Sequence, residues 1–114
     1  MRSSHLTDKY RYLRFTRAKK GGEGLTREQK RRAREELRAC GQGKSSWAGV
    51  IALAMDYYEA EDPVCRRLLQ LRYLDGMPEE RVVAKLHIGR TTYYHKELEA
   101  LSTVAVYAAA AGLM

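Results

Sequence analysis

The stretch IGRTTYYHKELEAL, residues 88–101, places hydroxyl, imidazole and charged side chains on a segment that otherwise repeats like a buried helix. A Thr side chain can hydrogen-bond to the edge of a base or touch a thymine methyl, and a Lys can donate to guanine acceptors. A Glu can accept from cytosine N4. Helix N-termini also attract phosphate, and Gly89 would let a phosphate approach the backbone closely. These residue types predict contacts with a nucleic acid.

Helical geometry separates these polar residues from an apolar face. At about 100° per residue, an apolar set falls within one arc of about 140°. We expect this arc to face a core, and its members are Tyr93, Val104, Ala108, Leu101, Tyr94, Ala105 and Leu98. The remaining circumference carries Thr91, Thr92, His95, Lys96 and Glu99. Arg90, in the first turn, is placed for a phosphate contact.

The residues before this helix predict two further helices. Asp62 and Pro63 form a helix start, with Asp as N-cap and Pro at the first helical position. LDG at residues 74–76 ends that helix, and Pro78 can open a shorter one, PEERVVAKL. A three-residue break at 87–89 then leads into the next helix. A short helix, a tight turn and a further helix indicate a helix-turn-helix, whose last helix enters the DNA major groove.

The run LLQLRYLDGMPEERVVAKLHIGRTTYYHKELEAL resembles the C-terminal half of the ArpU and RinA groups of phage late transcriptional regulators, which are similar to region 4 of sigma-70-type factors. The resemblance extends from about Val64 to Leu101, and its most specific parts are LRYLDG at 71–76 and RTTYY at 90–94. It implies a helix-turn-helix DNA-binding protein that acts on phage or prophage late genes. The recognition-helix positions that it implies are Arg90, Thr91, Thr92, Tyr94, His95 and Lys96.

Charge is concentrated at the N-terminus. Residues 1–46 carry 14 Lys and Arg against 5 Asp and Glu, a net charge of +9, whereas residues 47–114 carry 7 against 9, a net charge of −2. This asymmetry favours a polyanionic partner, with double-stranded DNA first and an anionic membrane surface second. Arg11, Arg14 and Arg17 could follow the DNA backbone or enter a minor groove. The alternative is that this basic arm serves only solubility.

The 114 residues suffice for one modest core, and 2 prolines among abundant Ala, Leu, Arg, Glu and Lys favour helix throughout. We therefore expect an all-α fold, a small helical domain with a C-terminal helix-turn-helix at about residues 63–101 and a basic N-terminal arm. Residues 1–24 form the arm and its Gly-rich linker, and residues 25–114 form the helical domain. Its first helix begins at a Thr26 capping box and ends near Cys40 with Gly41 as cap. A loop at 41–46 then ends in a Ser N-cap, before a core helix over 47–61 anchored by Trp47.

Several classes of function are disfavoured. Cys40 and Cys65 are isolated thiols, which fits a reducing cytosol and neither a zinc site nor a disulfide framework. No apolar run has the length of a membrane span or the flanks of a signal peptide, so we expect a cytoplasmic protein of a bacterial host cell, without membrane association. No catalytic triad, carboxylate pair, phosphate loop or metal-ligand cluster stands at a recognisable spacing. We expect no enzyme, cofactor or metal.

Three interpretations from different classes remain. The first is a sequence-specific transcriptional regulator that binds double-stranded DNA, with RNA polymerase as a further partner. The second is a small-terminase-type DNA-packaging component, for which the chain after Leu101 is short. The third is a polymerase-binding or other protein-interaction adaptor, in which Tyr93, Tyr94 and the Ala-rich tail meet a protein. The tail STVAVYAAAAGLM also suits contact between two helices, as in a homodimer that reads two half-sites.

Overall fold

The structure is a computed structural model, and it describes residues 25–114. These residues form helices and no strand, so the all-α prediction is confirmed for this part of the chain. The elements are α2 (Arg27–Gly41), α3 (Ala48–Glu61), α4 (Pro63–Leu69), the π-helical segment η1 (Gln70–Leu74), α5 (Glu79–Leu86) and α6 (Arg90–Ala110).

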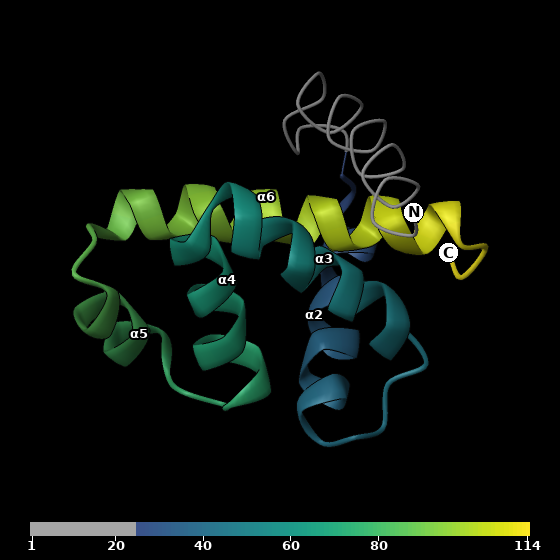
Figure 1. Ribbon diagram of the computed structural model, residues 1–114, viewed down its shortest axis with the longest axis horizontal. Coiled ribbons are helices and arrows are strands. Elements are labelled where there is room, and N and C mark those ends of the chain that lie inside the picture. The colour runs from purple at the N-terminus through teal and green to yellow at the C-terminus, as the bar shows by residue number, and fades with distance from the viewer. Residues whose placement is uncertain (1–24) are drawn as a thin grey trace.

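The longest helix, α6, runs along one side of the molecule, with α2, α4 and α5 beneath it and α3 crossing in front of it (Figure 1). It packs against α3, α2 and α4. The short helix α5 lies below the N-terminal end of α6 and packs against α4 and η1. Helix α6 therefore spans the whole arrangement. No helix within residues 25–114 combines the length and the apolarity that crossing a membrane requires.

Two of the three side-chain caps that the sequence predicts are present at helix starts. The Thr26 hydroxyl accepts from the Gln29 amide at 3.0 Å, and the Gln29 side chain accepts from the Thr26 amide at 2.9 Å. The Asp62 carboxylate accepts from the amide of Cys65 at 3.2 Å. The Ser N-cap predicted before α3 is wrong, because Trp47 is the N-cap and makes no side-chain cap hydrogen bond. Ser45 instead donates to Glu36 of α2 at 2.7 Å, which holds the loop against that helix.

The buried side chains form two clusters. The motif core joins α4, α5 and the start of α6 through Leu68, Val82, Leu86 and Tyr93. The bundle core joins α2, α3, α4, η1 and the rest of α6, and it is the larger of the two. Its largest fully buried side chains are Trp47, Tyr58, Leu37, Ile51, Leu69, Leu101, Val104 and Cys65. Trp47 is thus the core anchor that the sequence predicts.

Gly41 is needed for close packing and not as the helix cap that the sequence predicts. It is the last residue of α2, and Gln42 is the C-cap. A β-carbon at Gly41 would lie 2.7 Å from the carbonyl oxygen of Leu74 and 2.8 Å from that of Tyr73. Any larger residue would therefore push α2 away from η1. The π-helical turn itself closes with the Asp75 amide donating to the carbonyl of Gln70 at 2.8 Å.

The predicted inward arc of α6 is wrong at Tyr94 and Leu98, which are 44% and 37% exposed. Leu98 and Ala105 lie two turns apart on the same side of the helix, yet Ala105 is buried. The reason is that the bundle core reaches α6 only from Ala100 onward. The apolar edge of the N-terminal half therefore remains uncovered.

Candidate nucleic-acid interface

The turn between α5 and α6 has the geometry that the sequence predicts. Helix α5 ends at Leu86, and His87 takes the left-handed conformation, with φ 57° and ψ 43°. It is the one non-glycine residue with positive φ between residues 25 and 114. Gly89 is the N-cap of α6, with φ −74° and ψ 161°, and has no side-chain cap. The chain thus reverses within three residues and starts α6 at Arg90.

The motif core fixes α5 against the first turns of α6. Tyr93 is fully buried beside Val82 and Leu86. Partly buried aliphatic side chains close this core, and Ile88, at the centre of the turn, is one of them. Because apolar groups on both sides of the turn share one core, the two helices are held at a fixed angle. A helix pair held in this way can present one face of its second helix as a unit.

The first turns of α6 present an exposed face. Five of the six recognition-helix residues that the sequence predicts are exposed: Arg90, Thr91, Thr92, Tyr94 and His95. Arg90 lies 3.4 Å from a Glu79 carboxylate oxygen, and its side chain remains 61% exposed. The ring of Tyr94 contacts that of Tyr93 edge to face, with centroids 5.7 Å apart. These five side chains are brought together and face solvent.

Lys96 corrects the sequence prediction, because it does not lie free on this face. Its ammonium Nζ is 2.6 Å from Asp62 Oδ2, and both side chains are partly buried, at 24% and 26% exposed. The hydrogen bond to Asp62 raises the pKa of Lys96 above its ordinary value. Asp62 is also the N-cap of α4, so this pair ties the start of α4 to α6. In this structure Lys96 serves the fold.

A buried carboxylate beneath the exposed face escaped the sequence analysis. Glu97 is 7% exposed and accepts hydrogen bonds from the hydroxyls of Tyr73, at 2.5 Å, and Tyr93, at 3.5 Å. Burial and the neighbouring Glu97 raise the pKa of Tyr93 to about 12 and also raise the pKa of Tyr73. Both hydroxyls therefore stay protonated and donate. The available signal was spacing, since Glu97 follows Tyr93 by one turn and precedes Leu101 by one turn.

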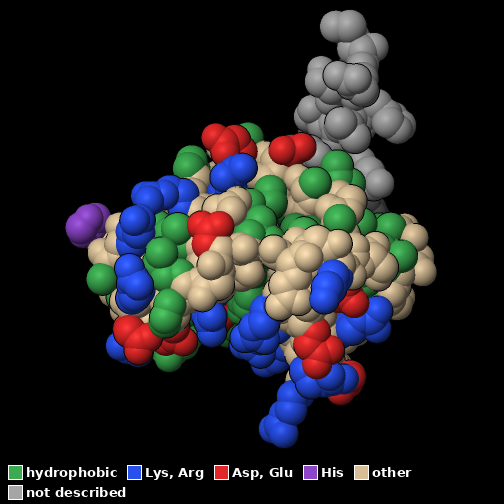
Figure 2. Space-filling model, turned by 90° about the horizontal axis from the view of Figure 1, so that it is seen from below, with side chains coloured by type: hydrophobic (Ala, Val, Ile, Leu, Met, Phe, Trp, Pro, Cys, Tyr) green, Lys and Arg blue, Asp and Glu red, His purple; other side chains and the backbone are tan. Residues whose placement is uncertain are grey.

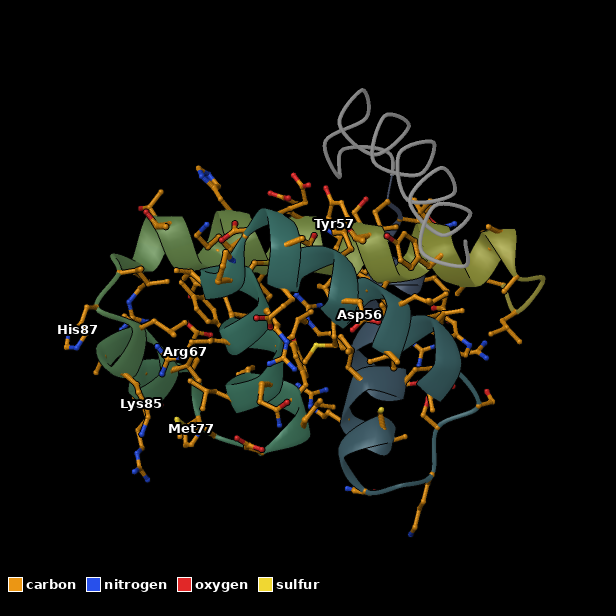
Figure 3. The ribbon with its side chains drawn as sticks, in the orientation of Figure 1. Asp56, Tyr57, Arg67, Met77, Lys85 and His87 are labelled. Atoms are coloured by element: carbon orange, nitrogen blue, oxygen red, sulfur yellow. The ribbon has the colours of Figure 1, made fainter. Side chains whose placement is uncertain are left out.

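Basic side chains lie beside the turn. Arg67 of α4 and Arg81 and Lys85 of α5 are exposed, and none forms an ion pair within residues 25–114. Figure 3 places Arg67, Lys85 and His87 at the end of the molecule that carries α5 and the start of α6. Unpaired basic groups at this end can meet phosphates on either side of a groove.

The Arg-rich helix α2 is partly neutralised by its own acids. Arg31 pairs with Glu28 and Glu35, and Arg32 pairs with Glu36 at 3.3 Å. Seen from the side away from α6, Lys and Arg side chains are scattered over both the α5 end and the bundle (Figure 2). The described part of the chain therefore carries its basic groups in several places. The arm residues Arg11, Arg14 and Arg17 lie outside the described residues.

Other kinds of site find no support in the described residues. No group of three or more His, Cys, Asp or Glu side chains within residues 25–114 could hold a metal ion. Cys40 and Cys65 are free thiols there, and burial raises the pKa of Cys65 to about 12, so it is a poor nucleophile at neutral pH. Tyr93, expected to meet a partner under the adaptor interpretation, is buried. The Ala-rich tail is divided: residues 102–105, 107 and 108 are buried in the molecule, whereas residues 109–114 are exposed.

Comparison with known proteins gives one match. Residues 52–105 are similar to the family DUF1492, which is described as a protein of unknown function. The matched segment begins within α3 and ends within α6, so it includes the whole helix-turn-helix. No curated protein and no solved structure matches the chain. The resemblance to the ArpU and RinA groups stays a hypothesis, and the similarity that is found is to DUF1492.

Proposed function

We propose that the chain is a sequence-specific DNA-binding transcriptional regulator of phage or prophage late genes. The observation that carries the proposal is the exposed start of α6, held by the motif core behind a three-residue turn. Arg90, Thr91, Thr92 and His95 offer hydrogen-bonding groups on this start. In the helix-turn-helix motif these are the positions that meet base edges in the major groove.

The surroundings support the same docking mode. Arg67, Arg81 and Lys85, which are exposed on α4 and α5, would contact phosphates while α6 enters the groove. Phosphate contacts position a protein without reading sequence, so these residues would supply affinity and α6 would supply specificity. Arg11, Arg14 and Arg17 of the N-terminal arm would add affinity in the same way.

The experiment is selection of bound sequences from random double-stranded DNA by the full chain. Enrichment of a discrete sequence is the expected result, and the spacing of its halves reports whether one copy or a homodimer reads it. Recovery of unbiased sequences would contradict sequence-specific binding. A footprint of the selected site within a late-gene control region of a phage or prophage genome would support the biological role.

Single-residue variants distinguish base recognition from attraction to phosphates. Thr91→Ala, Thr92→Ala and His95→Ala should each weaken binding to the selected site by about 1 to 3 kcal/mol and leave binding to scrambled DNA nearly unchanged. Lys85→Ala is the matched control, because losing a phosphate contact should weaken both equally and flatten the slope of log affinity against log salt by about 0.9. Equal losses on both duplexes for the α6 variants would refute base reading.

The arm is tested by the same salt titration. Replacement of Arg11, Arg14 and Arg17 by Ala should flatten the salt slope and leave the base preference of α6 unchanged. An unchanged slope would assign the charge of the arm to solubility or to another partner.

A second candidate is the protein-interaction adaptor, with RNA polymerase as partner. The observation that favours it is the exposed apolar pair Tyr94 and Leu98 on α6. Mass in solution and footprinting distinguish the candidates. A small oligomer with a discrete footprint supports the regulator, a large ring supports the small-terminase-type packaging component, and the absence of a footprint supports the adaptor.

A further inference from the structure

The exposed side of the first turns of α6 carries apolar side chains, which contacts with DNA phosphates would not require. Thr91, Tyr94, His95 and Leu98 follow one another at helical spacing and are all exposed, so they form one surface, the recognition face. Within residues 25–114 the large hydrophobic side chains that are exposed are Tyr94, Leu98, Leu113 and Met114. Half of these lie on the recognition face, in adjacent turns.

The side chains that usually read purines are missing from this face. Lys96 is bound to Asp62 at 2.6 Å, and Arg90, which is 61% exposed, precedes this stretch at the first residue of α6. Helix α6 contains no Asn or Gln. The bidentate contacts by which Arg, Lys, Asn and Gln recognise guanine and adenine are therefore not available between Thr91 and Leu98. What this face offers is methyl, aromatic and aliphatic surface, with hydrogen bonds from Thr and His.

We infer that the recognition face reads thymine C5-methyl groups in a T-rich major-groove site, with Tyr94 and Leu98 as the apolar contacts. The inference rests on the proposed function and names its substrate class. In the major groove the thymine methyl is the one apolar feature that distinguishes a base pair. From Thr91 to Leu98 the helix rises about 10 Å, which corresponds to about three base pairs.

The charge around the face favours DNA over a protein as its occupant. Three of the exposed basic side chains that form no ion pair in the described part of the chain, Arg67, Arg81 and Lys85, lie on α4 and α5 near the turn. Others, namely Arg27, Arg38 and Lys44, lie on α2 and the loop after it. Cations on α4 and α5 together with apolar contacts on α6 would complement a groove whose floor carries methyl groups and whose walls carry phosphates.

The test replaces thymine by deoxyuridine in the selected duplex, which removes only the methyl group. Each contacted methyl should be worth about fourfold in affinity, the value for burying one such carbon. The full chain is titrated onto thymine and deoxyuridine duplexes, with deoxyuridine placed outside the footprint as the DNA control. Because the change is made in the DNA, the folding of the protein is not affected.

Matched protein variants assign the methyl to a side chain. Leu98→Ala should weaken binding to the thymine duplex and lose its sensitivity to deoxyuridine at one position. Leu113→Ala makes the same change at a residue with the same exposed fraction, 37%, at the far end of the chain, and should retain both. Tyr94→Ala should remove the sensitivity at a neighbouring position.

Three results would overturn the inference. A selected site that is bound equally well with thymine or deoxyuridine would refute methyl reading and leave the DNA-binding function standing. Leu98→Ala with unchanged affinity for the thymine duplex would do the same and would leave the apolar pair for a protein partner. Failure to select any sequence would overturn both the inference and the proposed function.

Discussion

The two halves of α6 belong to one helix and have opposite surroundings. Every residue from 100 to 105 is buried, whereas only Tyr93 and Glu97 are buried between residues 90 and 98. The difference does not come from the helix itself, because apolar residues occur on the same side in both halves, as Leu98 and Ala105 show. Burial along a helix is set by the neighbours that reach it, here α2 and α3 in the C-terminal half.

The two halves of α6 therefore have different roles. The C-terminal half of α6 is a structural part of the bundle core, and the N-terminal half is covered on one side only by the small motif core. A surface that must meet a ligand has to leave side chains uncovered, and the stability lost there is supplied by burial elsewhere.

Two leucines three residues apart give the strongest test of the difference between the two halves of α6. Leu101→Ala removes a fully buried side chain from the bundle core and should lower the free energy of unfolding by about 2 to 5 kcal/mol. Leu98→Ala makes the same change on the exposed face and should cost about 1 kcal/mol or less. Urea denaturation of both variants measures the difference. Similar losses would show that the rotation of α6 is other than described.

The buried carboxylate gives the next largest effect. Tyr73→Phe deletes the hydroxyl that donates to Glu97 at 2.5 Å and should cost about 1 to 3 kcal/mol, because a buried acceptor loses a hydrogen-bond donor. Tyr94→Phe deletes an exposed hydroxyl and should change stability by less than about 0.5 kcal/mol. Equal stability of the two variants would mean that Glu97 does not depend on Tyr73.

Lys96 tests whether a residue in the N-terminal half of α6 contributes to stability or to base reading. Lys96→Ala breaks the ion pair with Asp62 and should cost about 0.5 to 1 kcal/mol, because both side chains retain some solvent contact. We expect the selected DNA sequence to be unchanged. His95→Ala, at the neighbouring residue, should leave stability unchanged and alter the selected sequence. A base preference that changes with Lys96→Ala would return Lys96 to the base-reading set.

The smallest predicted effect is a gain. His87→Gly relieves a left-handed backbone conformation that disfavours residues with a β-carbon, and should raise stability by about 0.5 to 1 kcal/mol after the entropy cost of glycine. Ala84→Gly, on the exposed side of α5, is the control and should lower it by about 1 kcal/mol. A loss at His87→Gly would indicate that the imidazole makes a stabilising contact.

Local signals in the sequence predicted the helices well. The Thr26 capping box, the Asp62 cap with Pro63, and the break at residues 87–89 all stand where they were predicted. These features depend on neighbours a few residues away, so sequence alone specifies them. The Ser cap before α3 failed because Trp47 is the N-cap of that helix. The Ser45 hydroxyl accepts from the Trp47 amide at 2.9 Å and donates to Glu36, nine residues earlier.

Long-range contacts set the limit of prediction at the candidate site. The exposure of Tyr94 follows from where the bundle core ends, and the loss of Lys96 from the face follows from Asp62, 34 residues earlier. The bond between Tyr73 and Glu97 spans 24 residues. Periodicity gives the side of a helix on which a residue lies, but which partner covers that side depends on the fold.

The continuity of α6 has a consequence for cooperativity. Because one uninterrupted helix contributes Tyr93 to the motif core and Leu101 to the bundle core, neither core can lose its structure without disturbing the helix that the other needs. The described part of the chain should therefore melt in a single transition. A ligand held at the first turns of α6 would then raise the melting temperature of the bundle as well, even though it touches only one end of the molecule.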